Sequence, residues 1–128
     1  MHQQGALAYQ QVGKQTLSGR DLEASLLSKS AVNLQRIRDN WENGATQNDL
    51  AAALRFNRRL WTVFMTAATA PESQLPQDVR ENVANLGIFI AKHMLQLQIE
   101  PAAQKLDVLI NINRQLAAGL RAQSAGQP

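Results

Sequence analysis

Proline and glycine divide this chain into long uninterrupted segments, and that division limits the folds it can adopt. The breaks are Gly44, Pro71, Pro76 and Pro101. Between them, apolar residues recur at every third or fourth position, which is the period of an amphipathic helix. No segment alternates apolar and polar residues for long enough to form a strand. The sequence therefore predicts an all-α protein, a compact bundle of about four long helices.

The first predicted long helix follows a short N-terminal segment. Residues 1–19 carry a single charge, Lys14, and are expected to form a short helix or an arm that lies on the core. Ser18 followed by Asp21 predicts a capped helix start, and the helix should run to about Asn43. One face of it gathers Leu26, Leu27, Ser30, Leu34, Ile37 and Trp41.

The second predicted helix begins at Thr46, has Asp49 in its first turn and ends before Pro71. Its apolar arc is wide, which predicts a central position in the bundle. The arc contains Leu50, Ala53, Leu54, Leu60, Trp61, Phe64, Met65 and Ala68. Asn57 lies within this arc, and a buried amide without partners costs about 1–3 kcal/mol. We therefore expect Asn57 to be hydrogen-bonded.

Two prolines mark the starts of the last two predicted helices. Pro76 suits the first turn of the third helix, and Pro101 can open the fourth. The third helix has a main stripe of Val79, Val83, Leu86, Ile90, Met94 and Leu97. The fourth has Leu106, Leu109, Ile110, Asn113, Leu116 and Leu120. Asn113 resembles Asn57 in lying on an apolar face, so the two amides are expected to satisfy buried backbone groups or each other.

Both of these helices carry more apolar surface than is needed to pack one helix face against the core. Ile88 and Leu95 lie off the stripe of the third helix, and Val108 and Ile112 lie off the stripe of the fourth. Either both helices are sandwiched within the bundle, or part of this surface meets a partner. The second interpretation places a partner-binding groove near these four residues.

Length and composition favour one cytoplasmic domain without a cofactor. The chain of 128 residues, taken as residues 1–128, fits a single domain, and the small polar tail at 122–128 is expected to be flexible. There is no cysteine, so disulfides and thiolate metal sites are excluded. The first residues do not have the pattern of a secretory signal, and no apolar run is long enough to span a bilayer. We expect no cofactor and no metal.

Neither catalysis nor nucleic-acid binding has a recognisable motif here. His93 lies at the edge of a helix stripe, where a packed histidine is more common than a base or ligand. The acidic residues fall mainly in first turns and on polar faces, where they stabilise helix dipoles. Arg55, Arg58 and Arg59 could contact RNA, but nucleic-acid binding favours a basic face with exposed aromatic residues, and the aromatic residues here fall mostly on apolar faces. Arg58 and Arg59 are expected to bind neighbouring acids or helix C-terminal carbonyls.

Several fragments together resemble the FlaF family of flagellar-biosynthesis proteins. They are Ala8-Tyr9, Ser18-Gly19-Arg20-Asp21-Leu22-Glu23-Ala24, Asn57-Arg58-Arg59-Leu60-Trp61, Leu75-Pro76, Leu86-Gly87-Ile88-Phe89-Ile90, Leu109-Ile110-Asn111-Ile112-Asn113-Arg114 and Gly119-Leu120. Their order and spacing cover about residues 8–121. For Trp61 we expect a core position, and for Gly87 a close approach of two helices. The partner-binding roles of Arg58, Arg59 and Arg114 stay open.

The resemblance implies a bacterial cytoplasmic factor for flagellum assembly. Family members are thought to bind flagellin as chaperones and to act with an antagonistic regulator that matches flagellin synthesis to export. It follows that the terminal segments of flagellin are the expected partner. Two alternatives stay open: a post-transcriptional regulator that touches RNA directly, and an adaptor that binds a fellow flagellar regulator without contacting flagellin.

Overall fold

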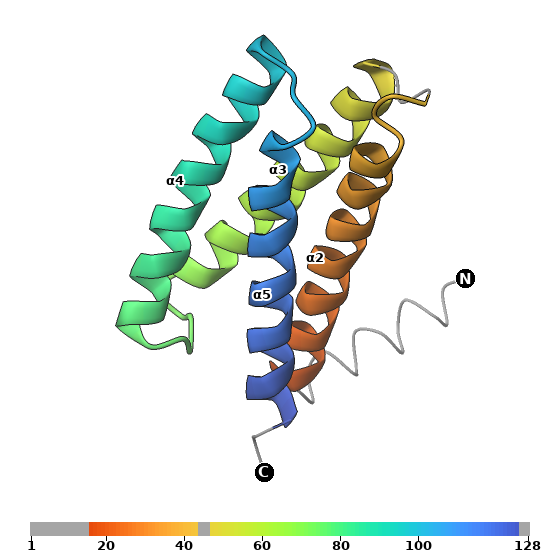
Figure 1. The fold of residues 1–128 in the computed structure, drawn as a ribbon. Coiled ribbons are helices and arrows are strands. Elements are labelled where there is room, and N and C mark those ends of the chain that lie inside the picture. The colour runs from red at the N-terminus through yellow and green to blue at the C-terminus, as the bar shows by residue number, and fades with distance from the viewer. Residues whose placement is uncertain (1–15, 44–46, 126–128) are drawn as a thin grey trace, which may run out of the picture.

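A computed structural model gives the arrangement of the helices (Figure 1). It describes residues 16–43 and 47–125, with side chains at 19–43 and 47–122. The described residues form four helices and no strand: α2 (Thr16–Asp39), α3 (Gln47–Thr69), α4 (Gln77–Ile99) and α5 (Lys105–Ala125). The prediction of an all-α bundle with four long helices is confirmed. The predicted N-terminal arm falls mainly on residues 1–15, which lie outside the described residues.

The helices do not contact one another equally. The most extensive contact joins α2 and α5, whereas α4 packs mainly on α3 and touches α5 at few positions. Arg38 pairs with Asp107, and Gln35 with Arg114, so α2 and α5 run antiparallel. Figure 1 shows α5 lying beside α2, with α4 on the opposite side of α5. Helix α4 is therefore the least covered of the four.

The core is built from the apolar faces that the helical period predicts. Its fully buried large side chains are Leu27, Leu34, Leu54, Ile90, Leu97, Leu106 and Leu109. Trp61 is also buried, and its ring meets that of Phe64 edge-on with the centroids 5.6 Å apart. Burial of side chains of this size stabilises a fold by roughly 1.5–3 kcal/mol each.

Both ends of α2 differ from the sequence prediction. The chain is already helical at Thr16, so the start predicted at Ser18 is wrong. The side chain of Ser18 lies outside the described set. At the other end, α2 stops at Asp39 and not at the predicted Asn43.

The side chain of Asn40 explains the early end of α2. Its amide nitrogen donates to the Arg36 carbonyl at 2.8 Å, and its backbone N–H bonds to the same oxygen at 3.1 Å. Asparagine often competes with the helical hydrogen-bond pattern in this way. The next residues form turns, with the Asn43 N–H on the Asn40 carbonyl at 3.0 Å. Gly44 and the predicted cap Thr46 lie outside the described residues.

The two prolines act differently from one another. Pro76 immediately precedes α4 with φ −56° and ψ 152°, and its carbonyl accepts from the Arg80 N–H at 3.0 Å. The prediction that Pro101 opens the last helix is wrong, because α5 begins only at Lys105. The residues after Pro101 first form a turn, in which the Lys105 N–H bonds to the Ala102 carbonyl at 3.1 Å. At its far end α5 continues to Ala125, so the helix includes the first residues of the tail expected to be flexible.

Gly87 allows α3 and α4 to approach closely. It is buried, and a methyl group at this position would overlap the sulfur and end carbons of Met65 on α3. Gly119 on α5 is the contrasting case, since it is exposed and a methyl group there would meet nothing. A side chain at the first glycine would therefore require Met65 to move, and one at the second would not displace any neighbour.

We expect Gly87→Ala to destabilise the protein by about 1–2 kcal/mol in spite of the better helix propensity of alanine, because Met65 must move. Gly119→Ala should stabilise it by about 0.5–1 kcal/mol. Urea unfolding followed by circular dichroism would measure both. In a Met65→Ala background the cost at Gly87 should disappear, and a cost that persists there would exclude this contact as the cause.

Candidate functional site

A row of exposed apolar side chains runs along the outer face of α4. Ile88, Leu95 and Ile99 are 53%, 58% and 76% exposed. The exposed Ala91 lies between the first two. At about 100° per residue these four positions lie within roughly a quarter of the helix circumference. We call this row the α4 stripe.

A hollow with two arginines from α3 lies beside the α4 stripe. A hollow of about 260 Å³ is lined by Leu54, Arg55 and Arg58 from α3 and by residues of α4 that include Ala91 and Leu95. Leu54 is buried, whereas both arginines are exposed. The stripe therefore borders a shallow hollow with an apolar base and a basic rim. Such a surface suits an amphipathic segment better than a uniformly apolar one.

The structure does not bring all four predicted groove residues together. Val108 and Ile112 are half-buried and pack against the core. Ile112 lies two helical turns after Lys105, whose carbonyl contacts His93 of α4. Ile88 and Leu95 lie about 140–160° around α4 from His93. The four residues therefore do not line one exposed groove: Val108 and Ile112 are half-buried on α5, whereas Ile88 and Leu95 are exposed on α4.

The three arginines of interest differ in their surroundings. Arg58 and Arg59 are exposed, and their side chains make no hydrogen bond or salt bridge within the described parts of the chain. The expectation that they bind neighbouring acids or helix ends is therefore wrong. Arg114 is different, because its Nη2 donates to Gln35 Oε1 on α2 at 3.4 Å. Arg58 and Arg59 remain available to a partner, whereas Arg114 links two helices.

A buried polar network joins all four helices. Ser30 Oγ and Asn113 Nδ2 both donate to Asn57 Oδ1 at 2.8 Å. Trp61 Nε1 donates to Asn113 Oδ1 at 2.9 Å, and Asn57 Nδ2 points to Met94 Sδ at 3.4 Å. Both amides are fully buried. The network therefore fixes the positions of the four helices relative to one another. Because its two amides are buried, they are not accessible to a ligand.

His93 has a structural environment. It is half-buried, its Nε2 lies 2.6 Å from the Lys105 carbonyl, and its ring stacks on Phe89 with the centroids 5.6 Å apart. A ring nitrogen that lies so close to a carbonyl oxygen donates to it, so Nε2 carries a proton. This bond ties α4 to the start of α5.

Two titrating groups depart from their ordinary behaviour, and both lie away from the α4 stripe. Burial raises the pKa of the Glu23 carboxyl, and the nearby Arg20 charge opposes the shift. The hydrogen bond to Asp107 raises the pKa of the Arg38 guanidinium, with Nε and Oδ1 2.9 Å apart. That pair links α2 to α5.

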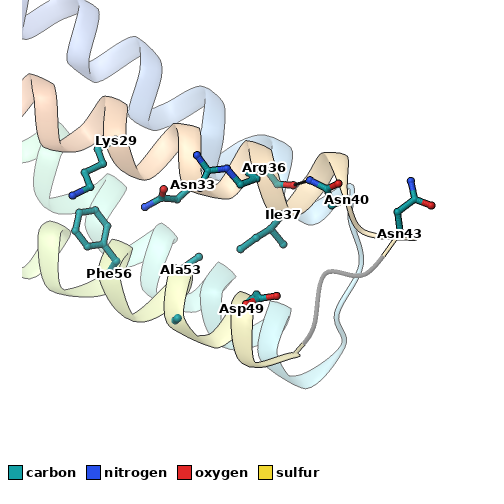
Figure 2. Close-up of a pocket in the computed structure, with 10 residues that line it drawn as sticks. Lys29, Asn33, Arg36, Ile37, Asn40, Asn43, Asp49, Ala53 and Phe56 are labelled. Carbon is teal, nitrogen blue, oxygen red and sulfur yellow. Dashed lines mark hydrogen bonds between the residues drawn. The ribbon is translucent and has the colours of Figure 1, made fainter.

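A second hollow, of about 650 Å³, opens between α2 and α3 (Figure 2). One wall carries Lys29, Asn33 and Arg36 of α2 and Asn40 directly after it, and Asp49 lies at the end of the groove on α3. Its base is apolar and includes Ile37, Ala53 and Phe56. We call this hollow the α2/α3 groove.

Neither Ile99 nor the α2/α3 groove is predicted from the sequence above. Ile99 follows Leu95 by four residues, so the helical period could have placed it on the same face. The polar residues of this wall also recur at helical spacing in the sequence, from Lys29 to Asn33, Arg36 and Asn40. That pattern is a signal, but it is indistinguishable from an ordinary solvated helix face until α3 is placed beside it.

The described residues have neither a membrane-spanning helix nor a cluster suited to a metal ion. No helix among them is long and apolar enough to cross a membrane. No group of three or more His, Asp or Glu side chains in this part of the chain is placed to hold a metal ion.

Comparison with known proteins identifies the family. No curated protein and no solved structure shows a significant match to the chain. A family profile described as flagellar protein FlaF matches residues 6–120, which is most of the sequence and contains α2, α3, α4 and most of α5. The chain belongs to the FlaF family of flagellar proteins.

Proposed function

We propose that this protein is a cytoplasmic flagellin chaperone that promotes the synthesis and export of flagellin, and that it acts by binding and not by catalysis. Membership of the FlaF family supports a role in the flagellum. The observation that carries the proposal is the α4 stripe, where Ile88, Leu95 and Ile99 form a continuous exposed row. Single exposed apolar residues are ordinary on protein surfaces, but a continuous apolar patch marks an interaction site.

The shape of the α4 stripe fits an amphipathic helix. From Ile88 to Ile99 the stripe extends about 16 Å, or three helical turns. The small side chain of Ala91 leaves room beside α3 for an apolar anchor of the partner. Terminal segments of flagellin are amphipathic and disordered before assembly, so they can supply anchors at helical spacing in a helix-in-groove contact.

Coupled folding and binding would suit a chaperone that must release its cargo. A disordered segment loses conformational entropy when it orders on the α4 stripe, and this loss weakens the affinity for a given buried area. Moderate affinity allows an export apparatus to take the cargo over. The same coupling gives binding a negative heat-capacity change, because apolar surface leaves water.

Isothermal titration calorimetry of the full chain against monomeric flagellin tests the proposal. We expect saturable binding whose enthalpy becomes more negative as temperature rises, and no binding to flagellin that lacks its terminal segments. Absence of both heat and co-elution at concentrations on the order of tens of micromolar would reject direct chaperoning.

The exposed arginines of α3 support a second candidate function. Arg55, Arg58 and Arg59 share the outer side of α3 and have no salt bridge within the described residues. These arginines could bind RNA directly, in which case the protein would be a post-transcriptional regulator. Alternatively, they could bind an antagonistic flagellar regulator. RNA binding would fall steeply with salt and would depend on all three arginines. A stable complex with the fellow regulator, without flagellin binding, would favour the adaptor role.

A further inference from the structure

Three polar residues of α2, together with Asn40 directly after its end, form one row above the α2/α3 groove. Lys29, Asn33, Arg36 and Asn40 are separated by four, three and four residues, which places them on one helix face. Figure 2 shows their side chains along the wall of the groove. Cationic and amide groups thus alternate over about 16 Å of helix.

The base of the groove supplies apolar surface beneath this polar row. Ile37 and Ala53 are buried, and the ring of Phe56 is half-buried. The Lys29 ammonium lies 5.6 Å from the centroid of the Phe56 ring, which holds one cation over the base. A ligand in the groove would therefore contact charge and apolar surface together.

The two cations of the row have no acidic partner within the described residues. The salt bridges there join Arg38 to Asp107 and Lys105 to Glu100. The carboxylate that lines the groove is Asp49, which lies in the first turn of α3 and has an interaction of its own. The middle of the groove is therefore positive, and an acidic ligand complements it.

We propose that the α2/α3 groove binds an extended acidic peptide segment of a partner protein. A side-chain amide both donates and accepts, so Asn33 can pair with the N–H and C=O groups of a peptide. Asn40 donates its Nδ2 to the Arg36 carbonyl, which leaves Oδ1 to accept from a peptide N–H. The two amides are seven residues apart, about 10.5 Å along the helix. Three residues of an extended strand cover about 10 Å, so successive peptide groups reach both amides.

The length of the groove sets the length of the segment. The row from Lys29 to Asn40 accommodates about five extended residues. Acidic side chains would meet the Lys29 ammonium and the Arg36 guanidinium, and an apolar side chain between them would rest on Phe56. The groove is open along its length between two helices, which favours a linear segment over an enclosed small molecule (Figure 2).

This site is separate from the one proposed for flagellin. Phe56 and Arg58 lie about 200° apart around α3, so the α2/α3 groove and the hollow beside the α4 stripe open on opposite sides of that helix. Both surfaces could be occupied at once. The inference goes beyond the chaperone proposal and does not depend on it.

Fluorescence anisotropy with a defined peptide tests the acidic site. The probe is a fluorescein-labelled hexapeptide that alternates glutamate and leucine, and its control replaces each glutamate with glutamine. The full chain should bind the acidic probe saturably with one site and the control at least tenfold more weakly. Lys29→Glu with Arg36→Glu should weaken binding at least tenfold. Arg55→Glu with Arg59→Glu changes the net charge equally on another face and should change binding less than twofold.

A second variant blocks the groove without changing charge. Ala52 is exposed and lines the groove, so Ala52→Trp should fill it and abolish probe binding, whereas Ala118→Trp on the exposed side of α5 should not. The proposal is overturned by absence of saturable binding, by equal losses in the two charge variants, or by full binding to Ala52→Trp. Displacement of the probe by an equal concentration of free glutamate would also overturn it, because the site would then be one for small anions.

Discussion

Asn113→Leu is expected to destabilise the protein by about 2–4 kcal/mol, although leucine is apolar and close to asparagine in size. The substitution removes the acceptor of the buried Trp61 N–H and one of the donors to Asn57 Oδ1. An unsatisfied buried polar group costs about 1–3 kcal/mol, and the branched side chain must fit a site shaped for a planar amide. Chemical denaturation monitored by Trp fluorescence and circular dichroism would measure the loss.

Two further variants separate the network from other causes. Trp61→Phe removes the N–H that Asn113→Leu leaves unpaired, so the double variant should lose less stability than the sum of the two single losses. Asn111 is an exposed asparagine on the same helix. Asn111→Leu makes the same chemical change there and should alter stability by less than about 0.5 kcal/mol. Strict additivity in the double-variant cycle would contradict the network interpretation.

Ile88→Asp with Leu95→Asp is expected to weaken flagellin binding at least about 100-fold and leave folding unchanged. Each of these side chains could contribute about 1.5–3 kcal/mol when fully buried by a partner, and about 1.4 kcal/mol corresponds to a factor of ten in affinity. Because both side chains are more than half exposed, aspartate at these positions meets water in the free protein. The measurement is a calorimetric titration of monomeric flagellin with each variant.

The matched control for this variant places the same charges on other faces. Val32 and Val63 are 52% and 69% exposed, on α2 and α3. Val32→Asp with Val63→Asp should bind flagellin as the unchanged protein does. Ile112 is unsuitable for this test, because it packs against the core and aspartate there would disturb folding. Equal affinity in the α4 variant and the control would remove the α4 stripe from the proposed binding surface.

Part of the candidate site could be predicted from the sequence. Ile88 and Leu95 were correctly identified as surplus apolar positions on their helix, because the helical period assigns each residue to a face. Val108 and Ile112 have the same local pattern on α5, yet they are half-buried. The difference depends on neighbouring helices: α5 lies between α2 and α4, whereas α4 has an extensive contact with α3 alone.

The sequence by itself determined the helical segments and the side of each helix that forms the core, because proline breaks and apolar periodicity act over a few residues. The tertiary structure alone decided which polar groups meet. Asn57 and Asn113 are 56 positions apart in sequence but share a hydrogen bond, and nothing local pairs them. It also decided that Lys29 and Arg36 border a groove and not open solvent, because a groove exists only once two helices are packed side by side.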